Sequence, residues 1–260
     1  GNVYPIPTVC PSCGSKRIKF FGSGTQKAEA EISQMPGVNV LRMDQDSTAG
    51  KLAHETILRR FAAKEANVLL GTQMVAKGHD IANVTLVGIL ASDSTLNLPD
   101  FRASERGFAL LTQAAGRAGR GEEPGTVVLQ TYDPENPVIR LAARQDYDTF
   151  AQRELTLRKD LFYPPYSEIL KLTVVDKEEE KAWELADRLA DFLREIIPQM
   201  PEKTEVMGPF PAGVAKVRDL YRMSVVVKSA AMEKVKEQLL QSEFKTMKNI
   251  YFDVDPVNSI

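Results

Sequence analysis

The 260-residue sequence is poor in disulfide-forming and metal-binding side chains, with only two cysteines and two histidines, and it has no long apolar run. A membrane-spanning helix needs about 20 consecutive apolar residues, so none is expected. Two cysteines cannot build a disulfide framework, and no signal peptide opens the chain. These absences exclude a disulfide-stapled secreted domain and a membrane protein, and they favour the cytoplasm.

A strong charge of either sign is also lacking, because 33 basic and 35 acidic residues leave a net charge of −2. This excludes a uniformly basic nucleic-acid binder, although a groove with a few well-placed Lys and Arg residues remains compatible with it. The apolar content of 43% is that of an ordinary globular protein. A chain of this length predicts about two domains.

Apolar, β-branched runs alternate with helical stretches in the first part of the sequence. This order predicts an α/β fold, with a parallel sheet covered by helices on both faces. The runs "NVLLG" (67–71) and "VTLVGIL" (84–90) are apolar almost throughout, which predicts burial on both faces. The expected strands are 18–21, 38–43, 67–71, 84–90 and 126–132, and the expected helices are 26–35, 51–63 and 101–118.

The pattern changes towards the end of the chain. A polar helix is expected over 137–161, and the paired prolines of "YPPY" (163–166) end it and mark a domain boundary. The order that follows, β-α-β-β-α-β, predicts a small α+β domain similar to a ferredoxin-like sandwich, with Trp183 in its core. Its expected elements are strand 168–175, helix 178–197, strands 204–208 and 221–228, helix 231–242 and strand 249–254.

The stretch "QAAGRAGRG" (113–121) places two arginines among small residues. On the expected helix, Gln113, Arg117 and Arg120 fall at i, i+4 and i+7 and share one stripe. The opposite face, expected to pack on the sheet, carries Phe101, Phe108, Leu111, Ala115 and Ala118. One interpretation is the solvated face of an amphipathic helix. The other is an anion site, because Gly116 and Gly119 each weaken a helix by ~1 kcal/mol and Arg suits forked contacts with phosphate oxygens.

A second polar segment follows the strand that ends at Gly71, within "LLGTQMVAKGHD" (69–80). Thr72 and Gln73 come directly after this strand, at its carboxyl end, where parallel α/β sheets bind their ligands. The loop continues with Lys77, which is a cation, and Gly78, which permits close backbone approach. Asp80 follows as a hydrogen-bond acceptor. Many strand-end loops have this composition, so the segment alone does not identify a site.

The segments "GTQMVAKGHD", "LPDFRASERGFALLTQAAGRAGR" and "CPSCG" together closely resemble the PriA family of bacterial replication-restart helicases, in superfamily 2. The resemblance extends through "YPPY" to the closing "FDVDPVNSI". It implies a remnant of a zinc-binding segment over 1–17, a RecA-like helicase lobe over 18–160, and a smaller α+β domain over 161–260. It also implies an ATP-dependent DNA helicase that unwinds stalled or branched replication forks and helps to reload the replication machinery.

Such motors hold ATP and Mg²⁺ between two RecA-like lobes, and the motifs of the first lobe are missing from this sequence. Neither G-x-x-x-x-G-K-[ST] nor a D-E-x-H box occurs, and the nearest approach, "AGKL" (49–52), lacks the upstream glycine and the hydroxyl after lysine. The resemblance therefore implies the C-terminal portion of the helicase. This portion is expected not to hydrolyse ATP alone.

The same resemblance implies roles for individual residues. Arg117 and Arg120 are arginine fingers that reach the γ-phosphate, a contribution of ~10³–10⁵ in rate. Gln113 joins this phosphate sensor. The implied nucleotide-binding positions are Gly78, Asp80 and Gly116, and the implied DNA-facing positions are Thr72, Gln73, Lys77 and Thr25.

The two thiols of "CPSCG", Cys10 and Cys13, match half of a zinc site in the resembled family. Zinc takes four ligands, and the only histidines, His54 and His79, are expected on a helix and a loop far from this pair. Zinc is therefore expected in the full-length protein and is expected to be absent or incomplete here. The alternative is that both cysteines are ordinary surface thiols.

The segment "GVAKVRDLYR" (213–222) places Lys216, Arg218 and Arg222 beside Tyr221, between two expected strands. Cations next to an aromatic ring can hold single-stranded DNA by charge and stacking. The alternative is a solvated hairpin with Tyr221 half in the core. The resemblance favours binding of branched and single-stranded DNA, of single-stranded-DNA-binding protein and of other primosome proteins.

Two rival interpretations stay open. A binding module without a motor would recognise DNA structure or a partner protein, and it would not need paired arginines beside glycine. A related motor that acts on RNA or on recombination junctions would fit the arginine helix, but the "CPSCG" segment speaks against it.

Overall fold

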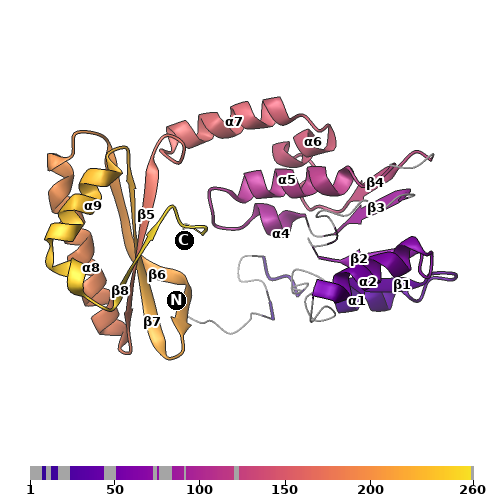
Figure 1. Ribbon diagram of the computed structural model, residues 1–260, viewed down its shortest axis with the longest axis horizontal. Helices are drawn as coiled ribbons and strands as arrows, with labels where there is room; N and C mark the ends of the chain where they lie inside the picture. Colours follow the sequence, from indigo (N-terminus) through magenta and orange to yellow (C-terminus); the bar gives the residue numbers. More distant parts are fainter. Residues whose placement is uncertain are drawn as a thin grey trace. The chain divides into compact units, whose positions relative to one another are not determined.

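A computed structural model describes residues 8–9, 13–16, 24–43, 51–72, 75, 84–90, 92–119 and 123–258, with backbone only at 51–53. The chain divides into two compact units (Figure 1). The N-terminal unit comprises Ile6–Leu98 and Arg102–Phe150, and the C-terminal unit contains Ala151–Ile260 and the short segment Pro99–Phe101. No helix in the described ranges is long and apolar enough to cross a bilayer.

The N-terminal unit has the predicted alternation of strands and helices. Its strands form two parallel pairs, β1 with β2 and β3 with β4. The predicted strand 18–21 lies outside the described residues. The elements are α1 (Thr25–Ile32), β1 (Val40–Met43), α2 (Lys51–Ala62), β2 (Val68–Gly71), β3 (Leu86–Ile89), α4 (Asp93–Leu96), α5 (Ala103–Ala115), β4 (Thr126–Leu129), α6 (Pro137–Ala143) and the start of α7 (Tyr147–Asp160).

The prediction that the strands are buried on both faces is wrong for β3 and β4. Helix α5 packs on the face that carries Ile89 and Leu129, where Phe108 and Leu111 are buried as predicted. On the other face, Leu86 is 62% exposed and Val128 is 58% exposed. An apolar strand is therefore not by itself a sign of two covered faces.

The predicted helix 137–161 is two helices, because the chain turns between α6 and α7. Gln145 has a left-handed backbone with φ of 54°, which ends α6. Asp146 then starts α7 as its cap, accepting a hydrogen bond from the Thr149 N–H at 3.1 Å. Short α4 was not predicted from the sequence. The predicted domain boundary after residue 160 falls at the end of α7.

The C-terminal unit has the predicted β-α-β-β-α-β order. Its four strands form one antiparallel sheet in the order β6-β7-β5-β8, the arrangement of a ferredoxin-like sandwich, and α8 and α9 cover one face of it (Figure 1). The elements are β5 (Glu168–Asp176), α8 (Glu179–Ile196), β6 (Thr204–Val217), β7 (Leu220–Ser229), α9 (Met232–Gln241) and β8 (Ile250–Val254), with two 3₁₀ turns, η1 (Ile197–Gln199) and η2 (Glu243–Thr246).

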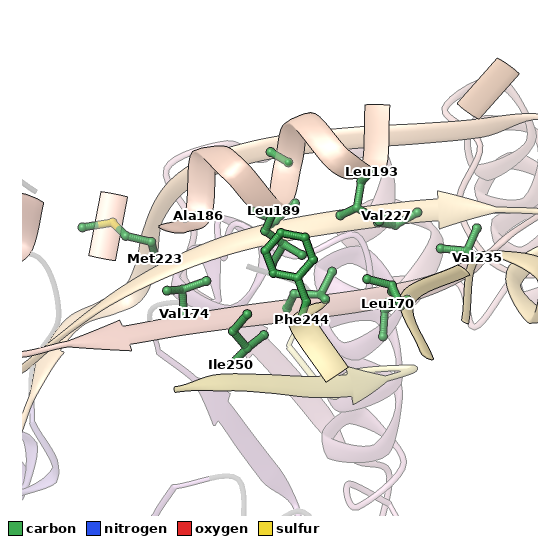
Figure 2. Close-up of a cluster of buried hydrophobic side chains, with 14 of the residues drawn as sticks. Leu170, Val174, Ala186, Leu189, Leu193, Met223, Val227, Val235, Phe244 and Ile250 are labelled. Atoms are coloured by element: carbon green, nitrogen blue, oxygen red, sulfur yellow. The ribbon is translucent and has the colours of Figure 1, made fainter. Parts of the chain in front are cut away.

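The core of this unit lies between the sheet and its two helices (Figure 2). Alternate residues of β5 and β7 point into it, as a strand period of two requires. Trp183 packs against this cluster, which confirms the prediction that it belongs to the core. The core residues labelled in Figure 2 are Leu170, Val174, Ala186, Leu189, Leu193, Met223, Val227, Val235, Phe244 and Ile250.

Strand β6 is much longer than the predicted strand 204–208. It contains Gly208, Pro209 and Pro211, although prolines cannot donate to a sheet ladder. However, β6 is an edge strand, and its pairing with β7 continues past register shifts after Met207 and Pro211. The segment predicted as a connection is therefore a long β-hairpin.

Candidate nucleotide and nucleic-acid sites

Helix α5 carries Gln113, but it ends before Arg117. The helix stops at Ala115, and the next N–H groups make shorter-range bonds, from Arg117 to the Ala114 carbonyl at 3.1 Å and from Ala118 to the Ala115 carbonyl at 3.2 Å. The predicted helix to residue 118 is thus wrong over its last turn. Gln113 is exposed and Arg117 is half-buried on the tightened turn. Arg120 lies outside the described residues.

The two glycines of this turn have different roles. Gly119 has φ of +75°, and a Cβ there would lie 2.8 Å from the Gly125 nitrogen, so the backbone itself requires glycine. Among the described residues, a Cβ at Gly116 would meet the Thr112 carbonyl oxygen at 3.4 Å and the Gln113 carbonyl oxygen at 3.7 Å, both ordinary contacts. The contacts in the described part of the chain therefore explain Gly119 but not Gly116.

The turn after α5 lies at the amino end of β3. The Gly119 N–H donates to the Val84 carbonyl at 2.9 Å, two residues before the strand begins. Val84 follows the segment that carries Lys77, Gly78 and Asp80 in the sequence. These three residues lie outside the described residues. Val84, the first described residue after them, is the one that is bonded to the turn with Arg117.

Thr72 occupies the predicted place at the carboxyl end of β2, where it is exposed. Its carbonyl accepts a hydrogen bond from the Val75 N–H at 3.1 Å, which turns the chain after the strand. A Cβ on Gly71 would collide with the Met43 carbonyl oxygen and with Val75, so only glycine fits there. Gln73 lies outside the described residues. Thr25 is half-buried as the first residue of α1.

Asp93, which the sequence did not single out, ties together the carboxyl ends of β3 and β4. Its carboxylate accepts hydrogen bonds from the Thr131 hydroxyl at 2.7 Å and the Tyr132 N–H at 3.2 Å. Burial alone would raise the pKa of Asp93, but these hydrogen bonds to the charged form outweigh it and lower the pKa. The acid anchors the start of α4, at the opposite end of β3 from Arg117.

The three predicted DNA-binding cations of the C-terminal unit do not form one surface. Arg218 lies with Asp219 in a two-residue turn, with φ of 48° and 63°, at the exposed tip of the β6–β7 hairpin. Lys216 pairs across the hairpin with Tyr221, and its Nζ lies 4.4 Å from the ring centroid. Arg222 is the next residue after Tyr221, so it points to the opposite face of the sheet.

Tyr221 is half-buried and packs against the core of the unit. With Lys216 over its ring, this tyrosine matches the alternative of a residue half in the core rather than a base-stacking platform. On the other face, Arg222 is close enough to Lys171 to influence its ionisation. Burial and then the charge of Arg222 lower the pKa of Lys171, and Asp253 opposes them. Lys171 and Arg222 therefore lie on the same face of the sheet.

The zinc prediction concerns a segment that is mostly outside the described residues. Cys13 is an exposed free thiol, and Cys10 lies outside the described residues. Within the described part of the chain, no three His, Cys, Asp or Glu side chains come together as metal ligands. Two thiols supply at most half of a four-ligand zinc site, so the site is not complete among these residues.

Two protein-family models match the chain. The helicase conserved C-terminal domain matches residues 13–122, and the primosomal protein N C-terminal domain matches residues 159–257. The first match contains α5 and the turn with Arg117, and the second contains the ferredoxin-like unit from β5 to β8.

Curated relatives extend over almost the whole chain. The replication restart protein PriA of Bacillus subtilis is 42% identical over 98% of this chain, and that of Synechocystis is 41% identical over 96%. The protein of the same name from Chlamydia pneumoniae is 38% identical over 98%. The chain spans 30–34% of the length of these relatives. It therefore belongs to the PriA family of replication restart proteins, of which it is a C-terminal portion.

Proposed function

We propose that this chain supplies the second RecA-like lobe and the C-terminal domain of an ATP-dependent DNA helicase. The helicase recognises and unwinds stalled or branched replication forks in the bacterial cytoplasm and helps to reload the replication machinery. Its partners are branched and single-stranded DNA, single-stranded-DNA-binding protein and other primosome proteins. The proposal is supported by the helicase C-terminal domain match and by the family of the relatives.

The turn after α5 is the observation that carries the motor proposal. Arg117 lies on a tightened turn that is hydrogen-bonded to Val84, just before β3. Val84 in turn follows the segment of Gly78 and Asp80 in the sequence. No contact with the described residues requires glycine at position 116, and close approach of a ligand is a sufficient reason for it.

In this proposal ATP with Mg²⁺ supplies the phosphoryl group when it is bound between this lobe and a first lobe. Arg117 and Arg120 stabilise negative charge at the γ-phosphate, and Gln113 senses it. The nucleotide-lining positions are Gly78, Asp80 and Gly116, and the DNA-facing positions of the lobe are Thr72, Gln73, Lys77 and Thr25. Cys10 and Cys13 supply two of four zinc ligands in the full-length protein.

The test replaces Arg117 in the full-length protein. DNA-stimulated ATP hydrolysis by Arg117→Ala is expected to fall by ~10³ or more, while binding of a fluorescent nucleotide is largely retained. The matched control is Arg59→Ala, whose exposed side chain pairs with Glu55. A rate within twofold of wild type would refute the arginine-finger role of Arg117 and favour the binding-module interpretation of this chain. Steady ATP hydrolysis by the present chain alone would contradict its proposed dependence on a first lobe.

The hairpin and the Lys171–Arg222 face are proposed to contact DNA phosphates. Arg218→Glu and Arg222→Glu in the full-length protein are expected to weaken binding of a synthetic fork and to reduce the salt slope by ~1 per lost contact. Lys216→Glu is expected to have the smallest effect of the three, because Lys216 is engaged with Tyr221. Lys181→Glu, which alters an exposed side chain paired with Glu178 in the first turn of α8, is the control. Unchanged affinity in both arginine variants would remove the hairpin from the DNA-binding surface.

A further inference from the structure

A short segment of the first part of the sequence belongs to the C-terminal unit. Pro99–Phe101 groups with that unit, whereas the chain before and after it groups with the N-terminal unit. The Phe101 ring stacks on Tyr163, with 4.8 Å between the ring centroids and 9° between the ring planes. The guanidinium carbon of Arg158 lies 5.0 Å from the Phe101 centroid. Phe101 was expected to pack on the sheet beside α5, and that expectation is wrong.

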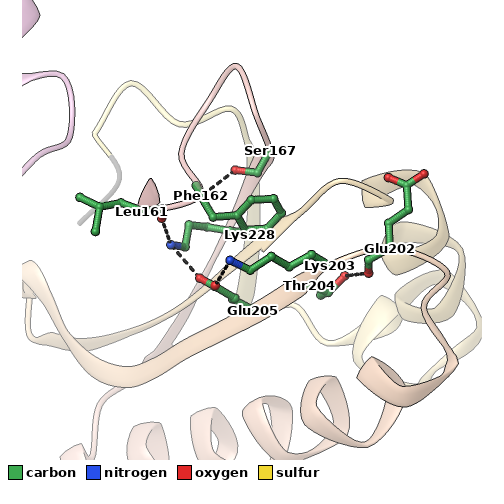
Figure 3. A network of polar contacts seen from close by, with 8 residues as sticks. All are labelled: Leu161, Phe162, Ser167, Glu202, Lys203, Thr204, Glu205 and Lys228. Carbon is green, nitrogen blue, oxygen red and sulfur yellow. Dashed lines mark hydrogen bonds and ion pairs between the residues drawn. The ribbon is translucent and has the colours of Figure 1, made fainter. Parts of the chain in front are cut away.

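Tyr163 is held in turn by a buried lysine. The Nζ of Lys228 lies 4.5 Å from the Tyr163 centroid, and only 5% of the residue is exposed. The same Nζ donates to the Leu161 carbonyl at 2.8 Å and pairs with Glu205 at 2.8 Å (Figure 3). A buried ammonium with these partners has little freedom to move, because any displacement leaves a buried charge or acceptor unpaired.

The loop around Tyr163 is fixed by tertiary contacts rather than by its own preference. Phe162 is buried in the left-handed region with φ of 54°, which is unfavourable for a bulky residue. The Lys203 Nζ lies 4.4 Å from the Phe162 centroid and also pairs with Glu205 (Figure 3). The Ser167 hydroxyl donates to the Phe162 carbonyl at 2.8 Å. Tyr163 is therefore presented to Phe101 on a rigid support.

On its C-terminal side, Phe101 is followed almost directly by α5, the helix that carries Gln113 and precedes the turn with Arg117. Only Arg102 separates Phe101 from the start of α5, and the 13-residue helix ends just before Arg117. Helix α5 is a rigid rod ~20 Å long. It is anchored in the N-terminal unit by Phe108, which stacks on Phe150 at 4.1 Å between centroids. Phe101 thus ties one end of this rod to the C-terminal unit.

We propose that the Phe101–Tyr163 stack couples the C-terminal unit to α5, so that DNA held by that unit raises the rate of ATP turnover through the position of Phe101. This inference rests on the proposed function. Phe101 and Tyr163 are positioning residues, because neither contacts the nucleotide. Coupling free energies between sites commonly correspond to factors of about 5–150, and the stack is expected to supply a factor at the lower end.

The experiment uses the full-length protein with Phe101→Leu, Tyr163→Leu and the double variant. ATP hydrolysis is measured without DNA and with saturating synthetic forked DNA, and fork affinity is measured without nucleotide. The DNA-free rate, the KM for ATP and the fork affinity are expected to stay within twofold. The fork-stimulated kcat is expected to fall about fivefold in each single variant and no further in the double variant. Phe101→Tyr and Tyr163→Phe, which keep the stack, are expected to retain the stimulated rate.

The controls separate coupling from folding. Tyr251→Leu alters a ring that is 58% exposed on β8 of the same unit, and it is expected to leave all rates unchanged. If Phe101→Leu fails to fold, Phe101→Met is measured in its place. Wild-type stimulation in both single variants, additive losses in the double variant, or equal losses with and without DNA would overturn the coupling. A wild-type protein without ATPase activity would instead overturn the proposed function on which the coupling rests.

Discussion

The two units of the chain bury their apolar side chains to very different extents. In the C-terminal unit, Leu172, Val174 and Val225 are completely buried between an antiparallel sheet and two helices. In the N-terminal unit, Leu86 and Val128 of the parallel pair β3–β4 remain more than half exposed. A four-stranded sheet with helices on one face completes its core locally. Two-stranded parallel pairs leave apolar surface, so their stability depends on how much of that surface becomes covered.

The largest expected effect comes from truncating the C-terminal core. Leu172→Ala is expected to lower the free energy of unfolding by about 2–5 kcal/mol, because it removes buried methyl groups and leaves a cavity. Trp183, the only tryptophan, packs on this core, so its fluorescence during urea unfolding reports on this unit. Leu240→Ala, at a position 58% exposed, is the matched control and is expected to change stability by less than about 0.5 kcal/mol. Equal losses of stability in the two variants would show that the buried core does not dominate the stability of the C-terminal unit.

Leu86→Ala extends the comparison to the N-terminal unit. Because this leucine is 62% exposed, its truncation is expected to leave the circular-dichroism melting curve of the chain nearly unchanged. A loss as large as that of Leu172→Ala would show that the outer face of β3 is covered in solution.

A smaller effect is expected at the buried lysine of the C-terminal unit. Lys228→Met leaves the Leu161 carbonyl without its donor and removes one of two cationic partners of Glu205, so a loss of about 1–3 kcal/mol is expected. The reference is Lys181→Met, which removes an exposed pair with Glu178 and is expected to be nearly neutral. Trp183 fluorescence in urea measures both variants. A neutral Lys228→Met would mean that the network is not a rigid support.

The glycines after α5 give a contrast within the N-terminal unit. Gly119→Ala is expected to destabilise the chain by about 1–2 kcal/mol, because its left-handed backbone and its approach to Gly125 exclude a Cβ. Gly116→Ala meets no such obstacle from the residues that the structure describes, and it is expected to be neutral or to stabilise by up to about 1 kcal/mol. Thermal unfolding by circular dichroism measures both. A loss of ATPase in full-length Gly116→Ala without a loss of stability would assign this glycine to the nucleotide.

A pH-dependent effect is expected on the acid side of the stability profile. Burial alone would raise the pKa of Glu205, but hydrogen bonds from Lys203 and Lys228 lower it below its ordinary value of 4.5. The stabilisation from this carboxylate is therefore fully present above about pH 4.5 and is lost as the pH falls through the lower folded-state pKa. Glu205→Gln should consequently be less stable than wild type at pH 7, with the difference shrinking by pH 3 in Trp183-monitored urea titrations. A difference independent of pH would show that the charge of Glu205 does not stabilise the network.

Much of the fold could be predicted because the pattern of each element is local. The β-α-β-β-α-β order and the core position of Trp183 were predicted from strand and helix periodicity, and the structure confirms both. The predicted ends of α5 and β6 were wrong for reasons that lie outside these segments. Helix α5 ends at Ala115 and is followed by a turn in which Gly119 bonds to Val84, whereas β6 continues because β7 pairs with it past the prolines.

The candidate site was likewise only partly predictable from the sequence. The resemblance singled out Gln113, Gly116 and Arg117, and the structure places them on α5 and the turn that follows it. It did not reveal Asp93, whose partners Thr131 and Tyr132 come from another part of the sequence. A lone Ser-Asp pair at the start of a short helix is the only local signal for that residue, and such a pair is common at helix starts.

The sequence by itself determined the order of the elements, the family and the residue types of the proposed phosphate sensor, because these depend on local periodicity and on motifs of adjacent residues. Only the tertiary structure decided that Phe101 stacks on Tyr163 rather than on the sheet, that the hairpin cations face different sides, and that Gly119 approaches Gly125. The physical reason is that each of these depends on contacts between segments far apart in the chain, which no local pattern of side chains specifies.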